Sequence, residues 1–160
     1  MSFLGGLLTF KAGVDGIAID ANDEWLYFAT INHSGLFRVR IRDLREPLLH
    51  ERELENLVER FSDKPLSDGL VASASSDIYV TDVEHGAIMA VDRQGGLSTV
   101  IRSSRIRWAD GMAFGPNGWL YVADSALPEL VLQTSDHIRS QGPYFIFRFN
   151  PAYDARVDHP

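Results

Sequence analysis

Short apolar runs, separated by Gly, Asn, Asp and Ser, follow one another along most of the chain. This is the pattern of short β-strands joined by tight turns. In the middle of the chain it predicts four consecutive strands, at about 69–73, 77–82, 86–92 and 97–102, with glycine-rich or serine-rich turns between them. Four strands in succession can form one complete antiparallel sheet. The predicted fold class is therefore all-β.

The same pattern recurs on both sides of this central group. Before it, strands are predicted at about 17–20, 25–30 and 35–41, and after it at about 111–114, 119–124 and 144–149. A long excursion, residues 125–142, separates the last two of these strands. Loops of this length in compact domains are usually functional, so we expect a lid-like segment over one face.

Each strand group opens with the dipeptide Asp-Gly, and an aromatic strand follows at a similar spacing in each group. Asp68 and Asp110 lie 42 residues apart, which is the length of one four-stranded propeller blade. The sequence thus predicts three blades of a β-propeller, at about 10–62, 63–104 and 105–151, followed by a tail at 152–160.

The first blade is longer than the others and needs an insertion. Within residues 43–60, leucines recur at helical spacing among charged residues. This pattern predicts a short pair of helices outside the blade, with Asp43 as a helix N-cap.

Three blades are too few to close a propeller ring, which has about four to eight blades. We therefore predict a partial propeller, completed either by self-association or by a missing N-terminal half.

Composition and charge limit the possible partners. The chain is 45% hydrophobic and carries a net charge of −7 without a block of Lys or Arg. Such a charge argues against nucleic acid and anionic membranes as partners, and favours cations. The chain has no cysteine, which excludes disulfides and thiolate chemistry but leaves the compartment open. Residues 2–10 lack the basic start and long apolar core of a signal peptide.

The three Asp-Gly aspartates, Asp15, Asp68 and Asp110, each precede the strand predicted to be innermost in its blade. One interpretation is that each carboxylate accepts backbone N–H bonds within its own turn. The other is that the carboxylates converge on the channel and hold a hard divalent cation such as Ca²⁺. Two carboxyl groups at such a short distance should instead share a proton when no cation is bound.

Two turns at equivalent positions contain histidine, Asn32-His33 and Glu84-His85. Either the rings bond the local backbone, or they line the same rim as the aspartates and bind ligand or transfer protons. Trp108, close to Asp110, either packs between blades or walls a binding pocket. Asp82 and Asp124 end equivalent strands, and we expect them to satisfy the adjacent turns.

Several of these motifs together resemble the bacterial branch of the major royal jelly and yellow protein family. They are Lys64-Pro65-Leu66-Ser67-Asp68-Gly69, Arg107-Trp108-Ala109-Asp110-Gly111 and the run from Pro143 to Arg148. The resemblance covers about residues 10–151. It implies a six-bladed propeller whose N-terminal half is missing here, an extracellular or periplasmic (secreted) location, and binding of a small-molecule ligand without established catalysis.

The same blades resemble, more distantly, the senescence-marker and gluconolactonase propellers, which are metal-dependent lactonases. That resemblance implies that Asp15 stands on the position of an Asn metal ligand, and Asp68 on that of an Asp that is both metal ligand and general base. The family's glutamate ligand has no counterpart here. The main prediction is therefore a small-molecule-binding protein of the royal jelly type. The alternatives are a metal-dependent lactonase-like hydrolase with Asp68 as catalytic residue, and a protein-interaction scaffold.

Overall fold

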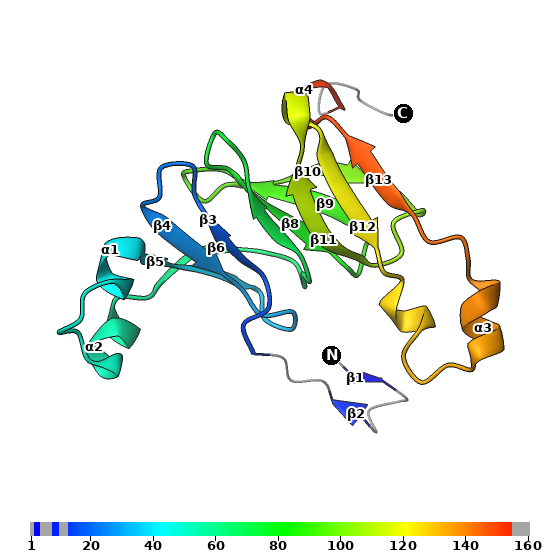
Figure 1. Cartoon of the computed structure of the whole chain (residues 1–160), viewed down its shortest axis with the longest axis horizontal. Coiled ribbons are helices and arrows are strands. Elements are labelled where there is room, and N and C mark those ends of the chain that lie inside the picture. The colour runs from blue at the N-terminus through cyan, green and yellow to red at the C-terminus, as the bar shows by residue number, and fades with distance from the viewer. Residues whose placement is uncertain (1, 4–7, 10–12, 155–160) are drawn as a thin grey trace.

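Three antiparallel sheets, arranged side by side, form the body of the protein (Figure 1). The computed structural model describes residues 2–3, 8–9 and 13–154. The predicted start of the first blade at 10–12 and most of the predicted tail, 155–160, lie outside the described residues. A short pair of strands, β1 (Ser2–Phe3) and β2 (Leu8–Thr9), precedes the three sheets.

The first sheet contains four strands in the order β3-β4-β5-β6. Their bounds are β3 (Ile17–Ile19), β4 (Trp25–Phe28), β5 (Gly35–Arg40) and β6 (Glu59–Asp63). The first three agree with the predicted strands. The fourth, β6, overlaps the end of the segment assigned to the insertion.

The predicted helical insertion is present between β5 and β6, at the outer end of the first sheet (Figure 1). It consists of α1 (Ile41–Leu44) and α2 (Glu51–Asn56). The prediction of Asp43 as a helix N-cap is wrong, because Asp43 lies inside α1. The backbone N–H of Ile41 still bonds the Glu24 carbonyl at 3.0 Å, so the helix begins directly at the end of the strand ladder.

The middle sheet agrees with the predicted four strands in number and order. It contains β7 (Leu70–Ala72), β8 (Ile78–Asp82), β9 (Ala87–Val91) and β10 (Leu97–Arg102). The turn between β8 and β9 requires glycine, because Gly86 has a φ of 60° and a Cβ there would lie 2.6 Å from the Ile106 carbonyl oxygen.

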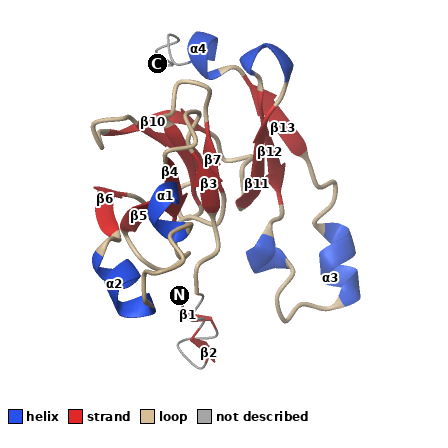
Figure 2. Cartoon of the chain, turned by 60° about the vertical axis from the view of Figure 1, so that its left-hand side comes forward, coloured by secondary structure: helices blue, strands red, loops and turns tan. Residues whose placement is uncertain are grey.

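The last sheet contains three strands within the described residues, in the order β11-β12-β13. They are β11 (Ala109–Phe114), β12 (Leu120–Asp124) and β13 (Ile146–Phe149). The turn η2 (Pro116–Gly118) joins the first two, and α4 (Pro151–Asp154) follows β13. The excursion after β12 contains η3 (Leu127–Glu129) and α3 (Ser135–Ser140). It extends beyond the ends of β12 and β13 (Figure 2), and its role as a lid stays a prediction.

The core consists of two apolar layers, one on each face of the middle sheet. Between the first and middle sheets lie Tyr27, Leu36, Ile78, Val80 and Val91. Between the middle and last sheets lie Tyr79, Ile88, Leu120, Val122 and Phe149. Because neighbouring strand residues face opposite sides, β8 supplies side chains to both layers. This face-to-face stacking confirms the predicted all-β, partial-propeller architecture.

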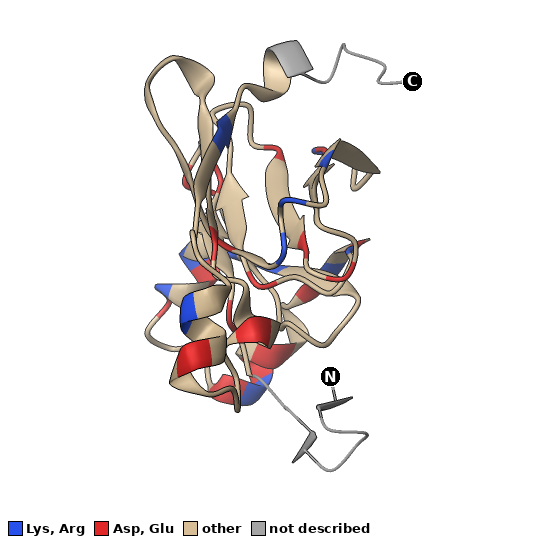
Figure 3. Cartoon of the chain, turned by 90° about the vertical axis from the view of Figure 1, so that its right-hand side faces the viewer, with Lys and Arg blue, Asp and Glu red and all other residues tan. Residues whose placement is uncertain are grey.

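No helix among the described residues is long and apolar enough to cross a membrane. Asp and Glu residues are concentrated in the lower half of the view in Figure 3, away from the end that carries α4. The Asp-Gly turns belong to this acidic end, because they lie at the beginnings of β3, β7 and β11, opposite the η2 turn next to α4.

Candidate functional site

The three Asp-Gly turns lie next to one another at one end of the stacked sheets. The strand β7 packs between β3 and β11, so the residues that begin these strands are brought together. The side chain of Asp15 is hydrogen-bonded to that of Asp68, and Asp15 also lies within the electrostatic influence of Asp110. We call Asp15, Asp68 and Asp110 the acidic cluster.

The glycines after Asp15 and Asp68 make this approach possible. A Cβ on Gly16 would lie 2.8 Å from Cβ of Leu70, and a Cβ on Gly69 would overlap the carbonyl oxygen of Asp110. The chain at Gly16 therefore passes β7, and the chain at Gly69 passes β11, too closely for a side chain to fit. The repeated dipeptide combines a carboxylate with the backbone space that the neighbouring sheet needs.

Thr81 on β8 fixes the backbone of the second Asp-Gly turn. Its side-chain oxygen accepts hydrogen bonds from the N–H groups of Asp68, at 2.9 Å, and Gly69, at 3.0 Å. Thr81 is fully buried, so both N–H groups are paired out of contact with water. The carboxylate of Asp68 is thus carried by a rigid turn.

Trp108 joins the acidic cluster from the last sheet. Its indole Nε1 donates to Oδ2 of Asp68 at 2.6 Å, and the residue is only 5% exposed. An indole N–H can only donate, so this oxygen of Asp68 acts as an acceptor. The sequence left Trp108 as either packing or a pocket wall. The structure gives it a polar contact with the cluster as well as a buried ring.

The environment of the cluster favours a retained proton. Burial raises the pKa of Asp15 from 3.8 to about 6, and the hydrogen bond to Asp68 and the negative charges of Asp68 and Asp110 act in the same direction. Burial, followed by the charge of Asp68, also raises the pKa of Asp110. Asp15 and Asp68 are therefore arranged as a pair of carboxyls that can share a proton.

The acidic cluster supplies oxygen ligands of the kind that Ca²⁺ prefers, but it is incomplete as a metal site. Among the residues that the structure describes, no group of three or more His, Asp or Glu side chains is arranged to hold a metal ion. Ca²⁺ takes about six to eight oxygen ligands. The donor set of this chain alone does not fit the ion, and the predicted metal site at Asp15, Asp68 and Asp110 stays a prediction.

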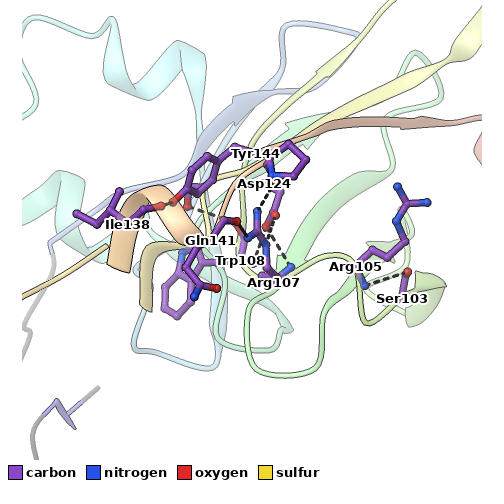
Figure 4. Close-up of polar contacts among 10 residues, drawn as sticks. Ser103, Arg105, Arg107, Trp108, Asp124, Ile138, Gln141 and Tyr144 are labelled. Carbon is purple, nitrogen blue, oxygen red and sulfur yellow. Dashed lines mark hydrogen bonds and ion pairs between the residues drawn. The ribbon is translucent and has the colours of Figure 1, made fainter. Parts of the chain in front are cut away.

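The ion pair between Arg107 and Asp124 fixes the backbone at Trp108 (Figure 4). The Asp124 carboxylate is fully buried and accepts from the Trp108 N–H at 2.9 Å and from the Arg107 N–H at 3.0 Å. The Arg107 Nε donates to the same carboxylate at 2.8 Å. Asp124 thus satisfies the adjacent loop, as expected from its position, and orients Trp108 as well.

The same arginine links this ion pair to the excursion after β12. Its guanidinium donates to the carbonyl oxygens of Gln141, at 2.8 Å, and Pro143, at 3.4 Å, and lies 5.1 Å from the centre of the Tyr144 ring. Contacts therefore run from the excursion through Arg107 and Asp124 to Trp108 (Figure 4). The Trp108 indole in turn bonds Asp68.

The two histidine turns make local contacts at the same end of the sheets. The His33 Nδ1 accepts from the Gly35 N–H at 2.9 Å, and the His85 Nδ1 lies 2.9 Å from both oxygens of Asp82. Asp82 also accepts from the Glu84 and His85 N–H groups, so it satisfies its turn as expected. These contacts agree with the local interpretation of both histidines. A ligand-binding role for Asn32, His33, Glu84 and His85 stays a prediction.

Lys64 braces the first histidine turn, a role that sequence patterns do not indicate. Its ammonium donates to the carbonyl oxygens of Thr30, at 2.9 Å, and Pro65, at 3.0 Å, and the residue is 3% exposed. Burial lowers the pKa of Lys64 from 10.5 to about 8. A lysine buried among carbonyl groups fixes the loop that follows Ala29, whose carbonyl bonds the Asp15 N–H.

An open pocket of about 490 Å³ lies at the opposite end of the sheets. Its walls come from the β7–β8 turn, the β11–β12 turn and residues 150–152, and include Tyr79 and Phe114. The acidic cluster does not line this pocket.

The fold is similar to that of several solved propeller proteins. A calcium-binding regucalcin from Agrobacterium tumefaciens superposes with a TM-score of 0.58 and 23% identity, over 84% of this chain and 44% of its own. A gluconolactonase from Xanthomonas campestris gives a TM-score of 0.52 and 16% identity, over 68% and 34% of the two chains. A luciferin-regenerating enzyme gives 0.57 and 14%, over 86% and 44%. No protein-family profile and no curated protein sequence matches the chain.

These similarities show the class of fold, a partial β-propeller that resembles part of the regucalcin and gluconolactonase structures. The chain spans less than half the length of each of these structures. They agree with the more distant of the two resemblances seen in the sequence. The resemblance to the royal jelly and yellow proteins stays a prediction.

Proposed function

We propose that the acidic cluster is the catalytic part of a lactonase-like site, which hydrolyses a small cyclic ester with Asp68 as general base. The observation that carries the proposal is the Asp15–Asp68 pair, in which one carboxyl has a pKa near 6 and the other accepts a hydrogen bond from Trp108. One group that holds a proton beside one that can take a proton is the arrangement required for acid–base catalysis.

In the proposed reaction, a water oxygen adds to the lactone carbonyl carbon while Asp68 accepts a proton from that water. The ring C–O bond then breaks, and the ring oxygen takes the proton that Asp15 holds. The product is a hydroxy acid. A proton that passes from Asp68 to Asp15 through their mutual hydrogen bond restores the starting state.

A divalent cation would need ligands beyond the acidic cluster, because the donor set of the described residues alone does not fit the ion. The regucalcin that shares the fold is described as calcium-binding, and the acidic cluster offers carboxylate oxygens to such an ion. Because Asp15 and Asp68 are arranged as a pair that can share a proton, a cation would have to displace that proton. The remaining ligands would have to come from water or from residues outside the cluster.

Hydrolysis of D-glucono-δ-lactone, followed by acid release with a pH indicator, tests the proposal. The wild-type chain should accelerate hydrolysis above the spontaneous rate, and Asp68→Asn should lower the acceleration by about 100-fold or more. Asp136→Asn is the matched control, because Asp136 is an exposed α3 residue, distant in sequence from the acidic cluster, that forms an ion pair with the exposed Arg139. The assay is run with added Ca²⁺ and with a chelator.

Absence of acceleration in both conditions would overturn the proposed hydrolase. Calorimetry with the same lactone then separates the remaining predictions. Binding without turnover would favour the small-molecule-binding protein of the royal jelly type, and no binding would favour a scaffold.

A further inference from the structure

The outer face of the first sheet is apolar, and its β3 side is exposed within the described residues, whereas Val39 on the same face is buried. The register of β3, β4 and β5 places Ile17, Phe28 and Phe37 on one face, and Ile19 and Leu26 beside them. This face lies opposite to Tyr27, which is part of the core shared with the middle sheet. Ile17 is 60% exposed and Ile19 is 49% exposed, far more than is usual for isoleucine on a sheet.

The outer face of the last sheet is similar. The pairing of β12 with β13 places Tyr121 and Ala123 on the side that faces away from the core, next to Arg148 and Ile146. Ile146 is 74% exposed. The opposite face of the same strands, with Val122 and Phe147, packs against the middle sheet. Both end sheets therefore have one face without a neighbouring sheet, and each of these faces exposes isoleucine; the face of the last sheet also carries Arg148.

The glycine of the third Asp-Gly turn indicates what belongs on the outer face of the last sheet. Gly16 and Gly69 each make room for the innermost strand of the following sheet. Gly111 has the same place in its turn, but the nearest atom to a Cβ there is Cβ of Ala123, at 3.9 Å in its own sheet. Space is thus left beside Gly111 for another innermost strand that begins with an Asp-Gly turn.

We propose that a second copy of this chain fills this space, with the outer face of its first sheet packed against the outer face of the last sheet. The β3 strand of the copy then lies beside Gly111 as β7 lies beside Gly16. A twofold axis along the channel makes the contact twice, because the last sheet of each copy meets the first sheet of the other. Both apolar faces of each chain are then buried, and the ring closes.

This pairing also completes the acidic end of the channel. By the same relation that brings Asp68 close to Asp110, Asp15 of one copy would lie close to Asp110 of the other. Two acidic clusters would then surround one channel. This inference concerns assembly, and it holds or fails independently of hydrolysis.

The molar mass in solution, measured by sedimentation equilibrium or light scattering, tests the proposal. The wild-type chain should give twice its monomer mass of 17.9 kDa. Ile17→Glu and Ile146→Glu should each weaken dimerisation by roughly 100-fold, because a carboxylate would be buried without a partner. Leu48→Glu is the matched control, since Leu48 is 82% exposed between α1 and α2 and lies on neither face.

Mixing the two variants distinguishes this arrangement from other dimers. In a mixed dimer of Ile17→Glu with Ile146→Glu, one of the two contacts carries no substitution, so mixing should recover part of the dimer. Circular dichroism of each variant establishes that it is folded. A wild-type chain that stays at 17.9 kDa at about 100 μM overturns the proposal. An Ile17→Glu variant that dimerises like the wild type also overturns it.

Discussion

The Cα of Gly69 faces the carbonyl oxygen of Asp110 so closely that no side-chain atom fits between the middle and last sheets at this point. Gly16 has the same relation to the strand that follows Asp68. The acidic cluster exists because the innermost strands approach each other this closely. The positions of its aspartates along the sheets are therefore set by backbone contact between the sheets.

Gly69→Ala should destabilise the protein by about 2 kcal/mol or more, because the added methyl group forces β7 away from β11. The free energy of unfolding in urea measures the effect. Gly13→Ala is the matched control, since a Cβ there meets nothing within 4 Å, and its stability should stay within about 1 kcal/mol of the wild type. Equal stability of the two variants would contradict the close approach.

Thr81→Val should cost about 3 kcal/mol, since it keeps the shape of the side chain but leaves the N–H groups of Asp68 and Gly69 buried without an acceptor. Thr81→Ser keeps the oxygen and should cost only about 1 kcal/mol. Urea unfolding of both variants gives the comparison. A larger loss in the serine variant would show that the methyl group, rather than the hydroxyl, supports the turn.

Asp15 should make the folded protein less stable as pH rises through its titration range. Its pKa is 3.8 in ordinary surroundings and about 6 in the folded chain, so between these values the folded state binds more protons than the unfolded state. Stability contributed by Asp15 is present below about pH 4 and lost by about pH 6. The effect should be small, because Asp15 remains exposed on one side.

Asp15→Asn should flatten the dependence of unfolding free energy on pH in this window, whereas Asp136→Asn should leave it unchanged. Asp110, whose pKa is raised by burial and by Asp68, acts in the same direction. If the unfolding free energy changed by the same amount between pH 4 and 6 in the wild type, in Asp15→Asn and in Asp136→Asn, a shared proton at Asp15 would be contradicted.

Asp124→Asn should cost about 3 kcal/mol and loosen Trp108, because it leaves Arg107 without its buried counter-charge. Urea unfolding measures the first effect. The second appears as a change in tryptophan fluorescence that Asp136→Asn does not produce. Unchanged fluorescence together with lost stability would show that Asp124 supports the loop without orienting the indole.

Local patterns predicted most of the strands, including all four of the middle sheet. They also led to the expectation that the three aspartates lie at one end of the fold. They could not identify the partners of these groups. The Trp108 indole meets Asp68 across 40 residues, and the Lys64 ammonium meets the Thr30 carbonyl across 34. Such contacts depend on how sheets stack. The start of α1 was misplaced for a related reason, since strand pairing at Ile41 overrode the capping preference of Asp43.

The space beside Gly111 also bears on how far the stack of sheets can extend. Gly16 and Gly69 each accommodate the sheet that follows them, whereas the place beside Gly111 is open, so a further sheet next to β11 would leave the two apolar layers already present unchanged.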